Sequence, residues 1–211
     1  MNDIREINEI FDLPLALFPS EISQRLGYKG NQMMMNKVRS QMMAAMDEAR
    51  ELLHPKAAVR TYAVTPGIRA IRFEGADLTI TAPEIVLWGC NFTHISVFAL
   101  TLGGALDEKM RAYDAAGEET HADMLEAIGN DVLAQSCNLL NERLVARGIS
   151  EGYQVSAFCC PGNGGWDLKE KAALLAAADP DGVLAVSAPQ PDELAPLCSA
   201  VGIIGWTPFA V

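Results

Sequence analysis

The chain of 211 residues has room for one large domain or two small ones, and half of its residues are apolar, which is enough for a filled core. This composition excludes collagen, coiled-coil rods and wholesale disorder. Acidic residues number 27 against 16 basic ones, so the formal net charge is −11. Phosphate backbones and anionic membrane surfaces repel such a chain, so we expect neither nucleic-acid binding nor membrane association, and the simplest role of the charge is solubility.

The N-terminal residues and the cysteines predict the compartment. Residues 1–10 mix acidic and apolar side chains and lack the apolar run of a signal peptide. No stretch approaches the roughly 18–20 apolar residues that a membrane helix needs. The five cysteines are odd in number and have no C-x-x-C spacing, which favours free thiols in a reducing cytosol over a disulfide framework. We therefore expect a cytoplasmic protein.

Two helices are predicted near the start of the chain. The first covers residues 20–27, with Ser20 as its N-cap and Gly27 as its stop, and the second runs from a cap at Asn31 to residues 54–55. Apolar residues recur in the second helix at spacings of three or four, which indicates a buried face: Met34, Val38, Met42, Ala45, Ala49 and Leu53. The six methionines of this segment favour core packing, with an adaptable partner-binding groove as the alternative.

The pattern then becomes typical of strands. Residues 59–64, 68–73 and 78–80 are short β-rich runs separated by turn residues, which predicts a strand followed by an antiparallel pair. Pro83 suits the first turn of a short helix. Residues 94–102 form a nearly continuous apolar run, as expected for a central strand covered on both faces.

Helices and strands continue to the end of the chain. We expect a helix after residues 103–104, the longest helix over residues 119–147 with its end at Gly148, a helix over 168–178, and strands over 154–158, 183–187 and 200–205. No internal repeat or low-complexity linker divides the chain. The partial segregation of helices and strands predicts one α+β domain with a mostly antiparallel sheet.

The most distinctive local feature is a glycine-rich loop between a predicted strand and a predicted helix. Gly162, Gly164 and Gly165 occupy three of four positions and allow backbone N–H groups to approach a ligand, while the helix start that follows favours a negative group. The loop is not a P-loop, because no Gly-Lys-Ser/Thr follows, and it is not a G-x-G-x-x-G motif, because Asp167 holds the last position. A tight turn without a ligand, with Trp166 packed beneath it, is the competing interpretation.

Metal and nucleophile chemistry find little support. The three histidines are scattered, no His or Cys pair has zinc-site spacing, and His94 is better read as a hydrogen-bonded core residue. Cys159 and Cys160 are adjacent, so on a strand their side chains point to opposite faces, which disfavours a redox pair. No Ser/His/Asp or Cys/His grouping can be assembled.

Five phrases in order carry a family resemblance: LGYKG at 26–30, VFALTLG at 97–103, LEAIGN at 125–130, PGNGGWDL at 161–168 and SAVGIIG at 199–205. Through them the chain resembles the activation domain of vitamin B12-dependent methionine synthase, in a small free-standing form, over about residues 20–206. The resemblance implies an α+β fold whose curved, mostly antiparallel sheet has flanking helices. Residues 1–211 would then be one domain, with residues 1–19 as an N-terminal extension.

The resemblance also implies a function. In the family the domain binds S-adenosylmethionine, docks over the corrin of a cobalamin-binding partner and presents the methyl group to cobalt, while a flavoprotein or other donor supplies one electron. We therefore expect a methyltransferase component that reactivates a corrinoid methyltransferase, such as methionine synthase, in trans. The cobalamin would be carried by that partner.

Two positions depart from the family loop, which reads Arg-x-x-Pro-Gly-Tyr and holds S-adenosylmethionine. Phe158 stands at the Arg position and cannot pair with a carboxylate, and Asn163 stands at the Tyr position. Backbone groups near Cys160, Gly162 and Asn163 would then carry cofactor binding, with Trp166 shaping the floor. The full expected set is Phe158, Cys160, Pro161, Gly162, Asn163, Gly164, Gly165 and Trp166. Two alternatives stay open: a docking or capping partner of a corrinoid protein without S-adenosylmethionine binding, and a binder of another small ligand.

Overall fold

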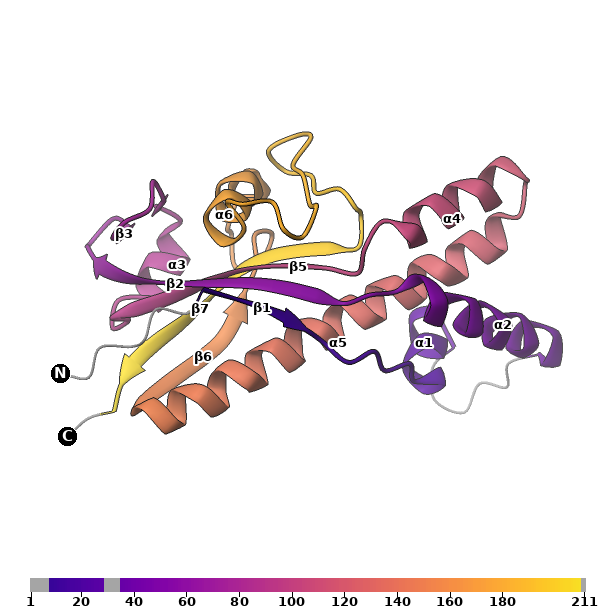
Figure 1. Ribbon diagram of the computed structural model, residues 1–211, viewed down its shortest axis with the longest axis horizontal. Helices are drawn as coiled ribbons and strands as arrows, with labels where there is room; N and C mark the ends of the chain where they lie inside the picture. The colour runs from indigo at the N-terminus through magenta and orange to yellow at the C-terminus, as the bar shows by residue number, and fades with distance from the viewer. Residues whose placement is uncertain (1–7, 29–34, 210–211) are drawn as a thin grey trace.

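The computed structural model describes residues 8–28 and 35–209, and its centre is a seven-stranded sheet (Figure 1). The strand order is β4-β3-β2-β5-β7-β6, with β1 also paired to β2, and every pair is antiparallel. The strands are β1 (Asn8–Asp12), β2 (Lys56–Pro66), β3 (Ile71–Phe73), β4 (Thr79–Ile80), β5 (His94–Thr101), β6 (Tyr153–Cys159) and β7 (Ser199–Pro208). The predicted α+β class with a mostly antiparallel sheet is confirmed.

Helices lie on both faces of this sheet and at one end of it. They are α1 (Pro19–Arg25), α2 (Asn36–Leu52), α3 (Pro83–Trp88), α4 (Ala105–Ala115), α5 (Glu119–Glu151) and α6 (Lys171–Ala178), the last preceded by the short 3₁₀ turn η1 (Leu168–Glu170). The long α5 runs along one face and α6 covers the other (Figure 1). No helix of the described residues has the length and apolar character needed to cross a bilayer.

Strand β5 divides the core into two layers, as its apolar run predicted. Phe98 and Leu100 belong to the cluster under α5 and α2, whereas Val97 and Ala99 belong to the cluster on the α6 side. From Ile95 to Thr101 the strand is buried throughout. Because successive side chains of a strand point to opposite faces, β5 contributes side chains to both core layers.

The beginnings of the first two helices differ from expectation. Ser20 is not the N-cap of α1, because the helix starts at Pro19 after Phe18, and proline is suited to the first turn. Gly27 ends this helix as predicted: its φ is +91°, and the Tyr28 N–H donates to the Ser23 carbonyl at 3.0 Å. Asn31 lies outside the described residues, and α2 begins at Asn36.

Helix α5 does not end at Gly148. It continues to Glu151 and closes at Gly152, which has a φ of +86°. Gly148 is buried within the helix, and a methyl group added there would overlap Val155 of β6. This glycine therefore allows close packing of α5 on the sheet.

The expected strand over residues 183–187 is absent, and only an isolated bridge joins Ser187 to Ala195. The buried carboxylate of Asp179 accepts hydrogen bonds from the N–H groups of Val183 at 2.9 Å and Leu184 at 2.8 Å. An aspartate that bonds the backbone a few residues onward stabilises a turn. The apolar run is consequently folded into a loop above the sheet.

The methionine-rich helix α2 has the buried face that its spacing predicted. Met42, Ala45, Met46 and Ala49 are all at most 3% exposed, whereas Met43 points outward. Met33 and Met34 lie outside the described residues. The soft side chains of α2 thus serve mainly as core packing against α5.

Candidate functional site

The glycine-rich loop follows β6, which pairs only with β7 within the described chain and so borders the sheet. Cys159 packs against the cluster on the α6 side and Cys160 against the cluster on the α5 side, as their adjacency predicted. Burial raises the pKa of the Cys160 thiol to about 12, and both thiols are free. These cysteines are therefore packing residues with little thiolate character.

The loop is a preformed pair of turns. The Asn163 N–H donates to the Cys160 carbonyl at 3.2 Å, the Trp166 N–H donates to the Asn163 carbonyl at 3.0 Å, and the Gly162 N–H donates back to the Trp166 carbonyl at 2.8 Å. Gly162, Gly164 and Gly165 all have positive φ, of 97°, 57° and 75°. Glycine is required by this path, because side-chain-bearing residues are strained there.

Two backbone donors of the loop are left available. The N–H groups of Gly164 and Gly165 donate no hydrogen bond within residues 8–28 and 35–209, and both residues are exposed. Successive free N–H groups in a turn can contact a ligand directly. The loop is therefore a closed turn in which two exposed backbone N–H groups make no hydrogen bond within the described residues.

Trp166 anchors the loop, as one interpretation anticipated. The side chain is 2% exposed and belongs to the cluster that contains Leu174 of α6. Its Nε1–H is buried and has no hydrogen-bond partner among the described residues. Pro161 is also buried, so the loop is attached to the core at both of its ends.

Phe158 is separated from Trp166, although both belong to the predicted site. It packs against the α5-side cluster, where its ring meets Phe98 edge to face with centroids 6.2 Å apart. Trp166 lies in the cluster on the opposite face of the sheet. The structure thus brings together residues 160–166, while Phe158 serves the core and Asn163 is exposed in the turn.

One residue beside the loop had no signal in the sequence. Glu84, in the first turn of α3, lies against Gly165: a methyl group built on this glycine would come within 3.2 Å of Glu84 Oε2. The short helix itself was predicted from Pro83. Its position next to a loop 81 residues further along the chain depends on tertiary packing, which local patterns do not report.

A second polar cluster, also unforeseen, joins α2, α4 and α5. The Glu48 carboxylate accepts hydrogen bonds from Tyr113 Oη at 3.0 Å and His121 Nε2 at 2.9 Å, and it pairs with Lys109 Nζ at 2.9 Å. Burial alone would raise the pKa of Glu48, but the hydrogen bonds from Lys109, His121 and Tyr113 together lower it. In the described part of the chain, no three His, Cys, Asp or Glu side chains form a group suited to a metal ion.

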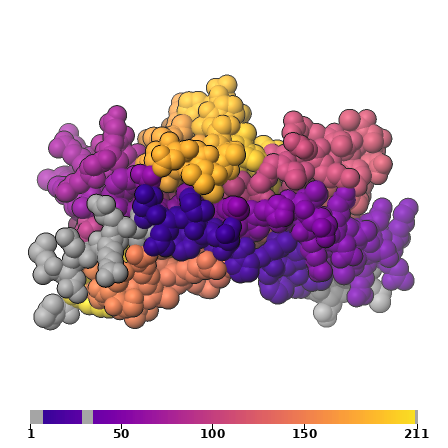
Figure 2. All heavy atoms as spheres, in the orientation of Figure 1, coloured from indigo at the N-terminus to yellow at the C-terminus, as the bar shows by residue number. Residues whose placement is uncertain are grey.

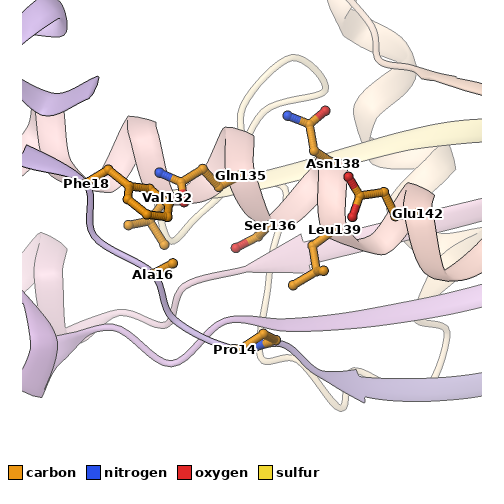
Figure 3. Close-up of a pocket in the computed structure, with 9 residues that line it drawn as sticks. All are labelled: Pro14, Ala16, Phe18, Val132, Gln135, Ser136, Asn138, Leu139 and Glu142. Atoms are coloured by element: carbon orange, nitrogen blue, oxygen red, sulfur yellow. The ribbon is translucent and has the colours of Figure 1, made fainter. Parts of the chain in front are cut away.

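Figure 3 shows a surface groove of about 500 Å³ between α5 and the segment that precedes α1. Phe18 and Val132 lie together at one end of the view, and Asn138 and Glu142 of α5 lie toward the other. None of the sequence-predicted site residues lines this groove. It is therefore a separate feature from the glycine-rich loop.

No family model and no curated protein matches the sequence. Among solved structures, the fold is similar to a crystal structure of the MetH reactivation domain bound to AdoHcy, with a TM-score of 0.69 and 14% sequence identity. The match covers 97% of this chain and 80% of that one. Likeness at this identity establishes the fold, and it confirms the structural resemblance that the five ordered sequence phrases indicated.

Proposed function

We propose that this chain docks on a cobalamin-carrying methyltransferase and assists its reactivation with S-adenosylmethionine as methyl source. The observation that carries the proposal is the match of nearly the whole chain to a reactivation domain whose structure holds AdoHcy. AdoHcy is what S-adenosylmethionine becomes when its sulfonium has lost the methyl group. The ordered family phrases in the sequence support the same role independently.

The glycine-rich loop is the proposed ligand site. Gly164 and Gly165 offer unpaired backbone N–H groups, and the buried Trp166 holds the turn in place before any ligand arrives. A preformed turn lowers the entropic cost of binding. The remaining loop residues, Cys160 to Asn163, would contribute backbone contacts.

The chemistry requires positioning more than proton transfer. A sulfonium methyl must be held in line with its acceptor, so the lack of an acid–base triad among the described residues is consistent with the role. The partner's cobalamin accepts the methyl group, and a separate donor such as a flavoprotein supplies the one electron that balances the step. This chain's task is to hold the methyl donor and to fit the partner.

Calorimetric titration of the purified protein with S-adenosylmethionine tests the ligand part. We expect saturable binding below about 1 mM, which corresponds to roughly 4 kcal/mol. A Trp166→Phe variant leaves a cavity beneath the loop, so we expect a lower melting temperature than the parent's and weaker S-adenosylmethionine binding, because the turn loses its buried anchor. Absence of binding at millimolar concentration would contradict the ligand role.

A non-catalytic docking partner is the second candidate, and the position of Phe158 favours it. The family guanidinium is replaced by a ring that packs on Phe98, so the ligand carboxylate loses its charged partner. This candidate predicts capture of a cobalamin-loaded methyltransferase by the immobilised protein, with no S-adenosylmethionine titration signal. Capture that requires S-adenosylmethionine would instead support the first candidate.

A further inference from the structure

We propose that Glu84 selects the charge of the ligand at the glycine-rich loop, so that the loop takes a ligand presenting a positive group, sulfonium or ammonium. The inference rests on the proposed function, because it concerns the same loop. It adds Glu84, from α3, to the loop site and states that this residue favours positively charged ligands.

The Glu84 side chain lies next to Gly165 of the loop. A methyl group at Gly165 would lie 3.2 Å from both Glu84 Cδ and Glu84 Oε2, so the carboxylate lies beside the loop backbone. Any larger side chain at residue 165 would displace it. Glu84 is exposed, and within the described residues it has no hydrogen bond or ion pair that would neutralise it.

The charged side chains around the loop also bear on which ligand it can take. Residues 158–167 contain no lysine or arginine, and Asp167 adds a second carboxylate, which accepts a hydrogen bond from the Lys169 N–H at 3.0 Å. The Lys171 ammonium donates to the Asp192 carbonyl at 2.9 Å, and its charge also acts on Cys160 at the start of the loop. Glu84 and Asp167 place two carboxylates on the other side, around Gly165 and Trp166, where they disfavour an anionic group and attract a cation.

The charge of the ligand matches that of Glu84. A sulfonium carries a positive charge but has no N–H or O–H to donate, so a nearby carboxylate is the group that recognises it. Loss of the methyl group leaves a neutral thioether, so an attraction between Glu84 and the sulfonium is lost, whereas an attraction to the ammonium remains. Where Glu84 faces the sulfonium, the loop would bind the methyl donor more tightly than its product.

The test compares three ligands by calorimetry: S-adenosylmethionine, AdoHcy, which has the ammonium but a neutral sulfur, and 5′-methylthioadenosine, which has neither charge. Each is titrated into the parent protein and into Glu84→Gln, with Glu51→Gln, an exposed carboxylate at the end of α2, as matched control. Glu84 is exposed, so Glu84→Gln should keep the parent's melting temperature. We expect Glu84→Gln to weaken S-adenosylmethionine about two- to fivefold, the size of an exposed charge interaction.

The set of ligands whose affinity falls in Glu84→Gln identifies the charged group that Glu84 attracts. Weakened S-adenosylmethionine with unchanged AdoHcy assigns the sulfonium, and equal weakening of both with unchanged 5′-methylthioadenosine assigns the ammonium. If Glu84→Gln binds all three ligands as the parent does, the charge selection is wrong while the proposed function stands. If the parent binds none of them, both fall.

Discussion

At the scale of single residues, the centre of the sheet depends on one buried hydroxyl. Ser96 Oγ accepts a hydrogen bond from Trp206 Nε1 at 2.8 Å and shares another with Thr61 Oγ1 at 2.6 Å, and all three side chains are buried. These residues come from β5, β7 and β2, so the hydroxyl links the three central strands. A buried polar group left without its partner costs far more than the net value of the bond.

Ser96→Ala should therefore lower the free energy of unfolding by about 1–3 kcal/mol, because the Trp206 N–H loses its acceptor. Urea denaturation followed by tryptophan fluorescence measures the change. Ser20→Ala is the control: Ser20 is exposed and does not cap α1, so its loss should cost less than about 0.5 kcal/mol. Equal stability of the Ser96→Ala protein and the parent would contradict the role of this network.

At the scale of elements, Glu48 ties three helices together. Its carboxylate on α2 meets Lys109 and Tyr113 of α4 and His121 of α5, and the Tyr113 and His121 rings lie 4.4 Å apart. The side chains of Glu48 and His121 are 23% and 22% exposed, so the cluster is partly shielded from water. Several partners on one carboxylate favour its ionised form.

This cluster makes stability depend on acid pH. Because the pKa of Glu48 is lowered from its ordinary value of 4.5 in the folded state, the cluster stabilises the protein fully above pH 4.5 and loses this contribution as the pH falls from there through the lower folded-state pKa. Urea unfolding of the parent and of Glu48→Gln should differ at pH 7 and converge toward pH 3. Glu51→Gln, on the same helix, should follow the parent at every pH. A constant difference between parent and Glu48→Gln would contradict the assignment.

Local patterns predicted most elements but not their contacts. The apolar run of β5 and the periodicity of α2 identified a central strand and a buried helical face, since burial on a regular element repeats with its period. Gly148 was misread as a stop because a glycine required for close packing resembles one required for a left-handed turn. Residues 183–187 have strand composition, but Asp179 holds them in a turn.

The candidate site was predictable only in part, because local patterns do not report tertiary contacts. The glycines and Trp166 are contiguous in sequence, so their turn could be anticipated from composition. Phe158 was included because it stands at the Arg position of the family loop, but the alternation of β6 places its side chain on the face of the sheet opposite to Trp166. Glu84 reaches the loop only through the packing of α3, which no local pattern encodes.

At the scale of the whole molecule, charge and shape bear on the proposed docking. Figure 2 shows the α6 region and α4 as two separate bulges on one side of the molecule. Between α4, α5 and residues 195–197 lies a hollow of about 440 Å³, lined by Asp107, Asp114, Asp123, Glu126 and the single cation Arg111, among others. With a net charge of −11, the chain repels an acidic face, so the proposed partner should offer a neutral or basic docking face.

The net negative charge should affect the rate at which this chain associates with the proposed partner. If a cobalamin-loaded methyltransferase presents a basic face, its association rate with this chain should fall several-fold as NaCl rises from about 0.05 M to about 0.5 M, because salt screens steering between exposed charges. The dissociation rate should change much less, since close contacts decide it. Surface plasmon resonance over this salt range separates the two rates. An Asp123→Lys, Glu126→Lys double variant should slow association at low salt, and an association rate insensitive to both salt and charge reversal would contradict electrostatic docking.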